Sequence, residues 1–373
     1  MKKLVIIGAN DFQNQLILKA KSLGYETHVF AWEEGAVGKS TADYFYPISI
    51  VEKEEILDKC KQIKPDGVCS IASDLASITV NYVAENLGLP CNKMKYSAIQ
   101  TNKYKMREAF MAAGLPCPKF VLADENFDES QVFDESQVKD FKFPIIVKPT
   151  DRSGSRNIMK LESTDGLLKA IKEACETSFE KKAIVEEYLE GNEYSMETIS
   201  SNGVHHFLAT TKKYTTGAPH FIETAHKQPS DLSPEIEKKA IDVIMKALDA
   251  LHIENSAGHS EFKVDSNGNI HIIEIGARMG GDCIGSDLVY LSTGNDFIKM
   301  VIDVACANEL EFAENPTHKE VQIHFMFTQE DLDKLEEIKK NNPECLYRVS
   351  DIEYENIGNV KDSGTRLGYY ITV

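Results

Sequence analysis

Residues 260–278 read SEFKVDSNGNIHIIEIGAR, in which two apolar-rich segments flank the turn residues 265–269, Asp-Ser-Asn-Gly-Asn. Asn-Gly between such segments is a strong signal of a β-hairpin, and it predicts antiparallel strands over 257–264 and 270–275. Successive side chains of a strand point to opposite faces of the sheet. The pattern therefore predicts an antiparallel sheet in this half of the chain, with alternate residues of the hairpin sharing a face.

One glutamate stands among apolar neighbours in each strand of this hairpin, Glu261 in the first and Glu274 in the second. An isolated carboxylate in such a setting is costly, which favours a functional reason for the pair. Two carboxylates on adjacent strands form a hard-oxygen site suited to Mg²⁺ and its phosphate ligands. Arg278 shares the strand face of Glu274 and is placed to bind a phosphoryl group. The alternative is a surface hairpin with chance acidic residues, which the apolar neighbours disfavour.

A short acidic segment follows a predicted strand over 183–186 and leads into a predicted strand over 193–200. One interpretation is a charged connector between subdomains. The other is an adenine slot, in which backbone groups bind the edge of the base and Glu193 accepts hydrogen bonds from ribose hydroxyls. The slot would be made by Glu186, Glu187, Tyr188 and Leu189.

Lys148 ends an apolar strand predicted over 145–148, and a loop of small residues follows it. A lysine in this place directs a cation beyond the sheet, and the backbone N–H groups of such a loop can bind phosphate oxygens. The loop residues concerned are Ser153, Gly154 and Ser155. The run does not match G-x-x-x-x-G-K-[ST], and a plain turn is the alternative.

The first 95 residues alternate strands with helices, which predicts a parallel sheet covered by helices on both faces. The strands are expected over 4–7, 26–31 and 67–72, and the helices over 13–23, 53–63 and 75–87. The turn after the first strand carries Gly8 alone instead of G-x-G-x-x-G, so a simple turn is favoured over NAD binding. Ser73 and Asp74 end the third strand, at the edge where ligands bind in such sheets.

Further helices and strands are predicted between this domain and the C-terminus. The helices lie over 103–113, 164–176, 233–251 and 296–307, and the additional strands over 158–161 and 204–211. A polar stretch over 124–140, with a near-repeat at 127–138, is interpreted as a solvated loop or helix start. The tail from 319 onward is expected to form strand, helix, strand and strand.

Two further segments are candidate substrate contacts. His226 stands in a polar run, 224–229, that is interpreted as a loop, where it either lines an acceptor pocket or is merely solvated. Gly281 and Asp282 follow Arg278 in a small-residue loop, which either faces the substrate or begins a helix.

Composition narrows the class of protein. The 373 residues carry 41 Lys and Arg against 59 Asp and Glu, a net charge of −18, which disfavours nucleic acid and anionic membranes as partners. No apolar run approaches the ~18 residues of a membrane span, and the apolar start of the chain is too short for a signal peptide. The eight cysteines form no C-x-x-C pair, as expected of reduced thiols in a cytoplasmic protein.

Taken in order, these motifs resemble those of the ATP-grasp superfamily, in particular its carboxylate–amine ligases of the L-amino-acid ligase and biotin-carboxylase-like kind. The resemblance spans the chain. It implies that Lys103, after Asn102, and Lys148 bind nucleotide phosphates, and that residues 151–157 form the phosphate loop. It further implies that residues 186–189 form the adenine hinge. It also implies that Glu193 binds the ribose and that Glu261 and Glu274 bind the metal. Arg278 would correspond to the family's arginine that follows these carboxylates.

Two positions depart from the family pattern. Asn102 replaces the acidic residue usual before the lysine, and Gly276 stands where E-x-N-x-R would place an asparagine. The second departure leaves two arrangements open, in which Glu274 bridges both metal ions or a water fills the place of the asparagine.

The resemblance implies an ATP-grasp fold of mixed α/β and α+β class. We expect an N-terminal parallel-sheet α/β domain over 1–100 and the first part of the ATP-grasp unit over 101–190, with a lid over 116–187. An antiparallel-sheet catalytic subdomain is expected over 191–310 and a small α/β cap over 311–373.

The implied function is an ATP- and Mg²⁺-dependent carboxylate–amine ligase that forms an amide through an acylphosphate and releases ADP and phosphate. It would use two Mg²⁺ ions, with Mn²⁺ as a substitute, and small carboxylate and amine substrates such as amino acids. Neither nucleic acid nor membrane is expected as a partner, and a homodimer is left open. The alternatives are a purine-biosynthesis or carbamoyl-phosphate type of ATP-grasp enzyme, a nucleotide-binding regulatory protein without turnover and, less favoured, a dehydrogenase.

Overall fold

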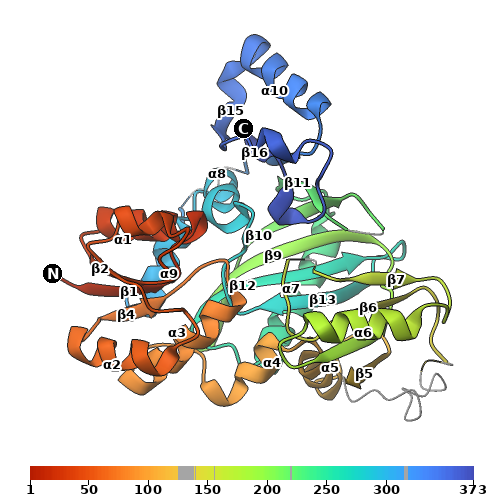
Figure 1. The fold of residues 1–373 in the computed structure, drawn as a ribbon, viewed down its shortest axis with the longest axis horizontal. Helices are drawn as coiled ribbons and strands as arrows, with labels where there is room; N and C mark the ends of the chain where they lie inside the picture. The colour runs from red at the N-terminus through yellow and green to blue at the C-terminus, as the bar shows by residue number, and fades with distance from the viewer. Residues whose placement is uncertain (125–137, 139, 155, 219–220, 315–317) are drawn as a thin grey trace.

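A computed structural model describes residues 1–373 except 125–137, 139, 155, 219–220 and 315–317 (Figure 1). Its strands form three sheets: a four-stranded N-terminal sheet, a second four-stranded sheet, and an eight-stranded sheet. The near-repeat at 127–138 lies outside the described residues, apart from Val138, so its structure is not tested. No described helix is long and apolar enough to cross a membrane.

The N-terminal sheet has the order β3-β2-β1-β4, and all its strands are parallel, as expected. The strands are β1 (Lys3–Ile7), β2 (Glu26–Phe30), β3 (Tyr44–Tyr46) and β4 (Gly67–Cys69). Leu4 and Ile6 of β1 pack in one buried cluster with α1 (Asp11–Ser22), while Val5 and Ile7 pack in another with α2 (Lys53–Ile63) and α3 (Asp74–Leu87). Figure 1 shows these helices on opposite faces of the sheet. Strand β3 has only three residues and was not expected.

The side chain of Gln13 fills the turn after β1. The amide of Gln13 accepts a hydrogen bond from the Asn10 N–H at 3.2 Å and donates to the buried Ile71 carbonyl at 2.6 Å. Gly8 has φ = 99°, and a β-carbon there would lie 3.0 Å from Gln13. The segment is therefore an internally bonded strand-to-helix turn.

The second sheet has the order β5-β8-β6-β7. Its strands are β5 (Phe120–Asp124), β6 (Ile145–Pro149), β7 (Met159–Leu161) and β8 (Lys182–Glu187). Ile145 and Val147 pack against α6 (Leu167–Thr177) in a buried cluster. Because strand residues alternate, Ile146 and Lys148 point to the opposite face. Strand β5 was not expected.

The eight-stranded sheet has the order β13-β12-β9-β10-β11-β14-β16-β15. The five strands at one end of this order are β9 (Asn192–Ser201), β10 (Val204–Thr215), β11 (Glu223–Gln228), β12 (Ser256–Val264) and β13 (Ile270–Gly276), with β13 at the edge. The tail contributes β14 (Val321–Met326), β15 (Leu346–Val349) and β16 (Gly368–Thr372), with α10 (Gln329–Asn341) between β14 and β15. The expected succession of strand, helix, strand and strand along the tail is confirmed. Because β14 pairs with β11, the tail extends the eight-stranded sheet.

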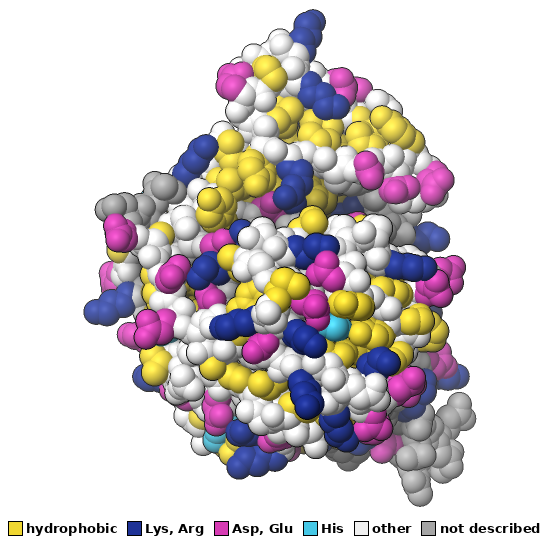
Figure 2. Space-filling model, turned by 90° about the vertical axis from the view of Figure 1, so that its left-hand side faces the viewer, with side chains coloured by type: hydrophobic (Ala, Val, Ile, Leu, Met, Phe, Trp, Pro, Cys, Tyr) yellow, Lys and Arg dark blue, Asp and Glu magenta, His cyan; other side chains and the backbone are white. Residues whose placement is uncertain are grey.

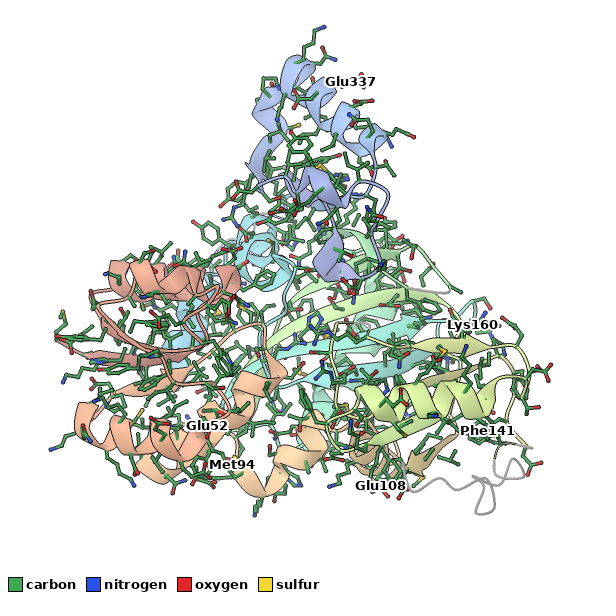
Figure 3. All side chains as sticks on the ribbon, in the orientation of Figure 1. Glu52, Met94, Glu108, Phe141, Lys160 and Glu337 are labelled. Carbon is green, nitrogen blue, oxygen red and sulfur yellow. The ribbon has the colours of Figure 1, made fainter. Side chains whose placement is uncertain are left out.

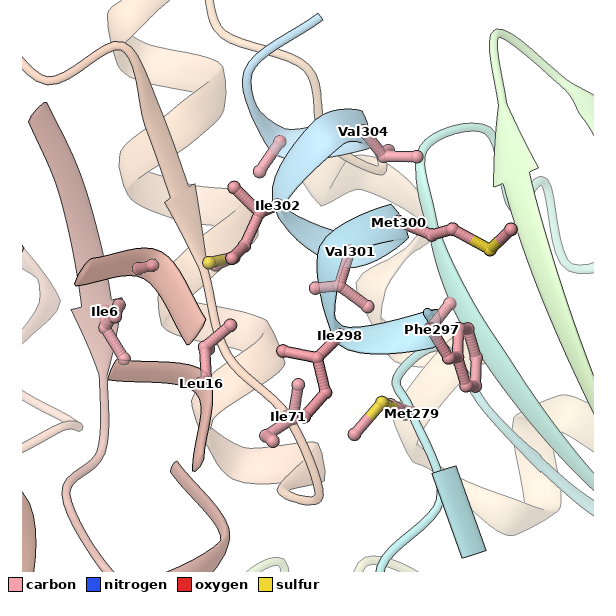
Figure 4. Packing of buried hydrophobic residues seen from close by; sticks show 14 of the residues in the cluster. Ile6, Leu16, Ile71, Met279, Phe297, Ile298, Met300, Val301, Ile302 and Val304 are labelled. Carbon is pink, nitrogen blue, oxygen red and sulfur yellow. The ribbon is translucent and has the colours of Figure 1, made fainter. Parts of the chain in front are cut away.

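Helices connect the domains through buried side chains. The amphipathic α7 (Pro234–Ala250) packs with Phe262 and Ile272 of the hairpin, and α5 (Lys103–Ala112) contributes Met106 and Phe110 to the same cluster. Helix α9 (Phe297–Ala305) lies between the N-terminal sheet and β9, β10 and β12 (Figure 4). Each fully buried Ile or Leu contributes about 1.5–3 kcal/mol to folding, so these contacts hold the N-terminal domain against the eight-stranded sheet.

The molecular surface carries both signs of charge. On the face shown in Figure 2, Lys and Arg side chains are interspersed with Asp and Glu and with small apolar groups. Figure 1 shows the tail, with α10, projecting from the rest of the molecule.

Candidate active site

A cavity of about 180 Å³ lies between the second sheet and the eight-stranded sheet, and it gathers most of the residues that the sequence indicated. Segments far apart in the chain meet there because α5, β6, β8, β12 and β13 all contribute to its wall. The predicted residues that line it are Lys103, Lys148, Ser153, Gly154, Glu186, Glu187, Tyr188, Leu189, Glu193, Glu261, Glu274 and Arg278. Ser155 lies outside the described residues.

The two hairpin glutamates lie directly opposite each other, with Glu261 paired to Glu274 in the β12–β13 ladder. Lys213 of β10 donates to Glu261 and lies 3.5 Å from Glu193. Lys103 donates to Glu274 at 2.9 Å. Burial tends to raise the pKa of Glu261, but the charge of Lys213 and the His259 hydrogen bond override it and hold that pKa well below its ordinary value.

This donor set fits a hard divalent cation. No cluster of three or more His, Cys, Asp or Glu able to hold a metal occurs among the described residues, so a metal here would rely on the carboxylate pair. Mg²⁺ is commonly bound by one or two carboxylates, and phosphate oxygens and water complete its shell. Glu261 and Glu274 are the residues that would hold it.

Gly276, where the family pattern has an asparagine, lies against the side chains of Asp74 and Arg278. A β-carbon at this position would lie 3.0 Å from Oδ1 of Asp74 and 3.1 Å from Nε of Arg278. Glycine therefore leaves room for Asp74 and Arg278 to approach each other behind the carboxylates.

Arg278 and Asp74 form a two-pronged ion pair, with Nε to Oδ1 at 2.8 Å and Nη2 to Oδ2 at 3.3 Å. Burial opposes the charged form of Arg278, but the charge of Asp74 raises its pKa above the ordinary value. Asp74 begins α3, so this pair joins the N-terminal domain to the hairpin. Ser73 caps the same helix, with its Oγ accepting from the Ala76 N–H at 3.2 Å. Neither Ser73 nor Asp74 lines the main cavity.

Lys148 is bound inside a buried charge cluster that the sequence did not reveal. Its Nζ lies 2.5 Å from Glu186, and the other oxygen of Glu186 accepts from Nε of Arg107 at 2.9 Å. Arg107 also donates to the Ile273 carbonyl at 2.7 Å. Burial would raise the pKa of Glu186, yet the charges of Arg107 and Lys148 lower it to about 2. Two cations thus surround one carboxylate, which leaves a net positive charge at this end of the cavity.

The connector after β8 combines an aromatic ring with lysines. The ring of Tyr188 lies 4.3 Å from Nζ of Lys263 and 4.8 Å from Nζ of Lys160, the residue labelled on β7 in Figure 3. Lys263 also donates to the Tyr188 hydroxyl at 3.1 Å. The Tyr188 N–H bonds to the Pro144 carbonyl at 3.0 Å, which fixes the connector against the second sheet.

Sequence reasoning missed His259, which lines the cavity beside Glu261, and Glu197, which binds His259 from behind. Glu197 is fully buried and accepts hydrogen bonds from His259 and, at 3.0 Å, from the Gly280 N–H. Nε2 of His259 lies 3.4 Å from Glu261. Burial would lower the pKa of His259, but the charge of Glu197 raises it to about 9. His259 precedes Glu261 by two residues and therefore shares its face, a signal that alternation alone provides.

The comparisons with known proteins agree with this geometry. The family described as "ATP-grasp domain" matches residues 141–287, which include the second-sheet strand β6, the connector and the hairpin carboxylates. Residues 141–287 are therefore similar to an ATP-grasp domain.

Curated relatives of this chain carry ligase names. It is 30% identical to D-alanine–D-alanine ligase B of Chromobacterium violaceum over 208 residues, which are 54% of this chain and 66% of the relative. It is 28% identical to alanine–anticapsin ligase of Bacillus subtilis over 303 residues, 72% of this chain and 62% of the relative. The chain thus spans less than two thirds of the length of these relatives.

Solved structures match the whole chain in fold. L-amino acid ligase from Bacillus licheniformis has a TM-score of 0.80 at 21% identity, with 100% of this chain and 93% of that chain covered. Phosphoribosylglycinamide synthetase from Anaerococcus prevotii has a TM-score of 0.76 at 20% identity, with the same coverage. These likenesses confirm the expected fold.

His226 does not lie in a loop of this ATP-grasp fold, so that prediction was wrong. It belongs to β11, between β10 and β14, and its side chain is buried outside the main cavity. The run Glu223–Gln228 has only one apolar residue and resembles a loop in sequence, but its backbone pairs with β10 and β14. Nε2 of His226 lies 3.7 Å from Asp282.

Gly281 and Asp282 also lie beside the main cavity and do not line it. A β-carbon on Gly281 would lie 3.7 Å from that of Ala72, at the edge of the N-terminal domain. Asp282 binds Arg366 through both carboxylate oxygens, at 2.8 and 3.0 Å. The sequence did not indicate Arg366, which comes from the tail.

Proposed function

We propose that this chain is an ATP- and Mg²⁺-dependent carboxylate–amine ligase that releases ADP and phosphate. The observation that carries the proposal is the opposition of Glu261 and Glu274 in one cavity with the cations Lys103, Lys148 and Arg278. A carboxylate pair together with several cations suits a nucleotide triphosphate and its metal. The ligase names of the relatives, which join alanine to anticapsin or D-alanine to D-alanine, support the amino-acid class of substrate.

The nucleotide would lie across the connector. Backbone groups of residues 186–189 would bind the adenine, and Glu193 would accept hydrogen bonds from the ribose. Lys103 and Lys148 would neutralise phosphate oxygens, with the 151–157 loop beside them. A Mg²⁺ ion held by Glu261 and Glu274, singly or as one of two, would neutralise charge on the β- and γ-phosphates.

In the first step, a substrate carboxylate oxygen attacks the γ-phosphorus, and ADP leaves with the electron pair of the broken bond. An amine then attacks the acylphosphate carbonyl carbon and displaces phosphate, so that an amide forms. The protein contributes position and charge: Arg278, fixed by Asp74, holds the phosphoryl group or the carboxylate as charge moves. The second sheet, as a lid over 116–187, would exclude water that hydrolyses the intermediate.

The experiment is ADP release from purified protein with ATP, Mg²⁺ and a panel of amino acids offered singly and in pairs. We expect ADP only when both a carboxylate and an amine substrate are present, with a new amide detected by mass spectrometry. Phosphoribosylamine or bicarbonate with ammonia as the only productive substrates would indicate the purine-type or carbamoyl-phosphate alternative. ATP binding without turnover on any substrate would indicate a regulatory protein.

A further inference from the structure

The tail contributes a turn, Asp362–Arg366, that lies against the wall of the candidate site. Ser363 Oγ donates a hydrogen bond to Oε2 of Glu223 at 2.7 Å, and Glu223 lines the main cavity. Arg366 binds Asp282 through two N–H groups, at 2.8 and 3.0 Å. One turn of the tail therefore contacts two separate segments of the site, although more than 80 residues separate it from either one in sequence.

Arg366 is held firmly enough to fix its partner. Its guanidinium lies 3.7 Å from the centre of the Phe325 ring, and its Nε donates to the Ser363 carbonyl at 2.8 Å. The side chain is only 10% exposed. These contacts hold the plane of the guanidinium, because the ring packs on its face and the carboxylate binds its edge.

Asp282 lies in a backbone segment that needs such support. Asp282 and Cys283 both have positive φ angles, 50° and 61°, which side-chain-bearing residues rarely adopt. Strained conformations of this kind persist when surrounding contacts determine them. Asp282 follows Arg278 by four residues. The ion pair with Arg366 therefore holds the C-terminal end of the segment that follows β13.

Glu223 connects the same turn to the carboxylate pair. Lys213 lies 3.8 Å from Glu223 and also donates to Glu261. The contacts thus run from Ser363 through Glu223 and Lys213 to one of the two hairpin glutamates.

We infer that the turn Asp362–Arg366 is part of the active site: Arg366, through Asp282, and Ser363, through Glu223, are positioning residues that set the affinity for the non-nucleotide substrate. The identity of that substrate, a small carboxylate or amine, rests on the proposed function. The adenine connector and Lys148 lie on the second sheet, and neither Arg366 nor Asp282 lines the cavity, so we expect ATP affinity to depend little on this turn.

The test compares Arg366→Lys, which keeps the charge but loses the two-pronged geometry, with Ser363→Ala. We expect Arg366→Lys to raise the KM for the amino-acid substrate about tenfold, and Ser363→Ala about threefold, with the ATP dissociation constant changed less than about twofold. Arg348→Lys is the matched control, because Arg348 is another tail arginine, bound to Asp287 at 2.7 Å. We expect that control to leave the amino-acid KM unchanged.

An unchanged KM in Arg366→Lys, or an ATP dissociation constant that rises in parallel with it, would overturn the inference. So would the same KM change in Arg348→Lys, since that indicates general loosening of the tail. If Arg366→Lys does not fold, an unchanged KM in Ser363→Ala overturns the inference, and a raised KM supports it.

Amide hydrogen exchange separates this inference from the proposed function. If the unmodified protein releases no ADP with any amino acid, the proposed function fails. Exchange at residues 279–284, a segment that excludes Asp287, the partner of Arg348, then tests the contact itself. Faster exchange there in Arg366→Lys than in Arg348→Lys supports the positioning role, and equal exchange contradicts it.

Discussion

Glu261 and Glu274 lie directly opposite each other across the β12–β13 ladder, and each is bound by a different lysine. Lys213 reaches Glu261 from the neighbouring part of the same sheet, whereas Lys103 reaches Glu274 from the start of α5. The carboxylate pair is therefore held in place from both sides of the cavity, and its negative charge lies next to the cations that would bind phosphates.

Changing either carboxylate to its amide should abolish turnover while sparing the fold. Glu261→Gln and Glu274→Gln keep the size of the side chain but remove the charge that a metal requires, so we expect Mg²⁺-dependent ADP release to fall by at least about 100-fold. Metal-free nucleotide binding, measured by calorimetry, should change less than about threefold. Glu320→Gln is the control, since Glu320 pairs with Lys227 in an exposed position. Near-normal activity in either hairpin variant would refute the assignment.

Lys148→Met should weaken ATP binding. The substitution keeps length and apolar contact but deletes a buried cation, and it leaves Glu186 paired with Arg107 alone. We expect ATP affinity to fall about tenfold, equivalent to ~1.4 kcal/mol. Lys169→Met, on the exposed face of α6, should leave it unchanged. Equal ATP affinity of Lys148→Met and the unmodified protein by calorimetry would remove Lys148 from the site.

Asp74→Asn should impair chemistry more than nucleotide binding. An amide cannot hold both prongs of Arg278 with full charge, so the guanidinium loses its fixed orientation. We expect kcat to fall about tenfold with the KM for ATP nearly unchanged. A loss confined to the KM for ATP would contradict this role. Ser77→Ala, one turn further along α3, is the control for damage to the helix.

Proton uptake by His324 in the unfolded chain should lower the free energy of unfolding in mild acid. Burial lowers its pKa to about 4, although Asp331 opposes the shift, and its ring stacks on Tyr370 at 4.7 Å. In the unfolded chain its pKa returns to about 6.5, so the unfolded state binds more protons between pH 4 and 6.5. The free energy of unfolding should therefore fall by up to about 3 kcal/mol as the pH drops from 6.5 to 4.

Urea unfolding at several pH values tests this. His324→Gln cannot take up the proton, so its stability should depend less on pH in that window than that of the unmodified protein. Parallel pH profiles for the two proteins would show that His324 does not contribute.

The sequence predicted those features of the fold and the site that depend on residues close together in the chain. The hairpin turn and strand alternation predicted that Glu261 and Glu274 share a site, and capping and breaker residues placed α2 and α5 to within one residue. It was uninformative where a partner lies far away in the chain. Arg107, Glu197 and Arg366 contact residues 79, 62 and 84 positions distant, and no local spacing reports such pairs.

Strands without apolar alternation were also missed. His226 lies in a polar strand whose backbone pairs with β10 and β14, so hydrophobic periodicity could not detect it. Strand β3 is too short for any period to emerge. The sequence showed that Gly276 departs from the family pattern, but not that Asp74 and Arg278 lie against it, because Asp74 is about 200 residues away in the chain.

The most direct test of the proposed chemistry follows the oxygen atoms of the substrate carboxylate. If the reaction passes through an acylphosphate, the oxygen that attacks phosphorus leaves with phosphate when the amine forms the amide. With a substrate whose carboxylate carries heavy oxygen, we predict ADP as the nucleotide product and one labelled oxygen in the released phosphate. AMP as the product, or ADP with wholly unlabelled phosphate, would contradict the mechanism even if ATP binding were demonstrated.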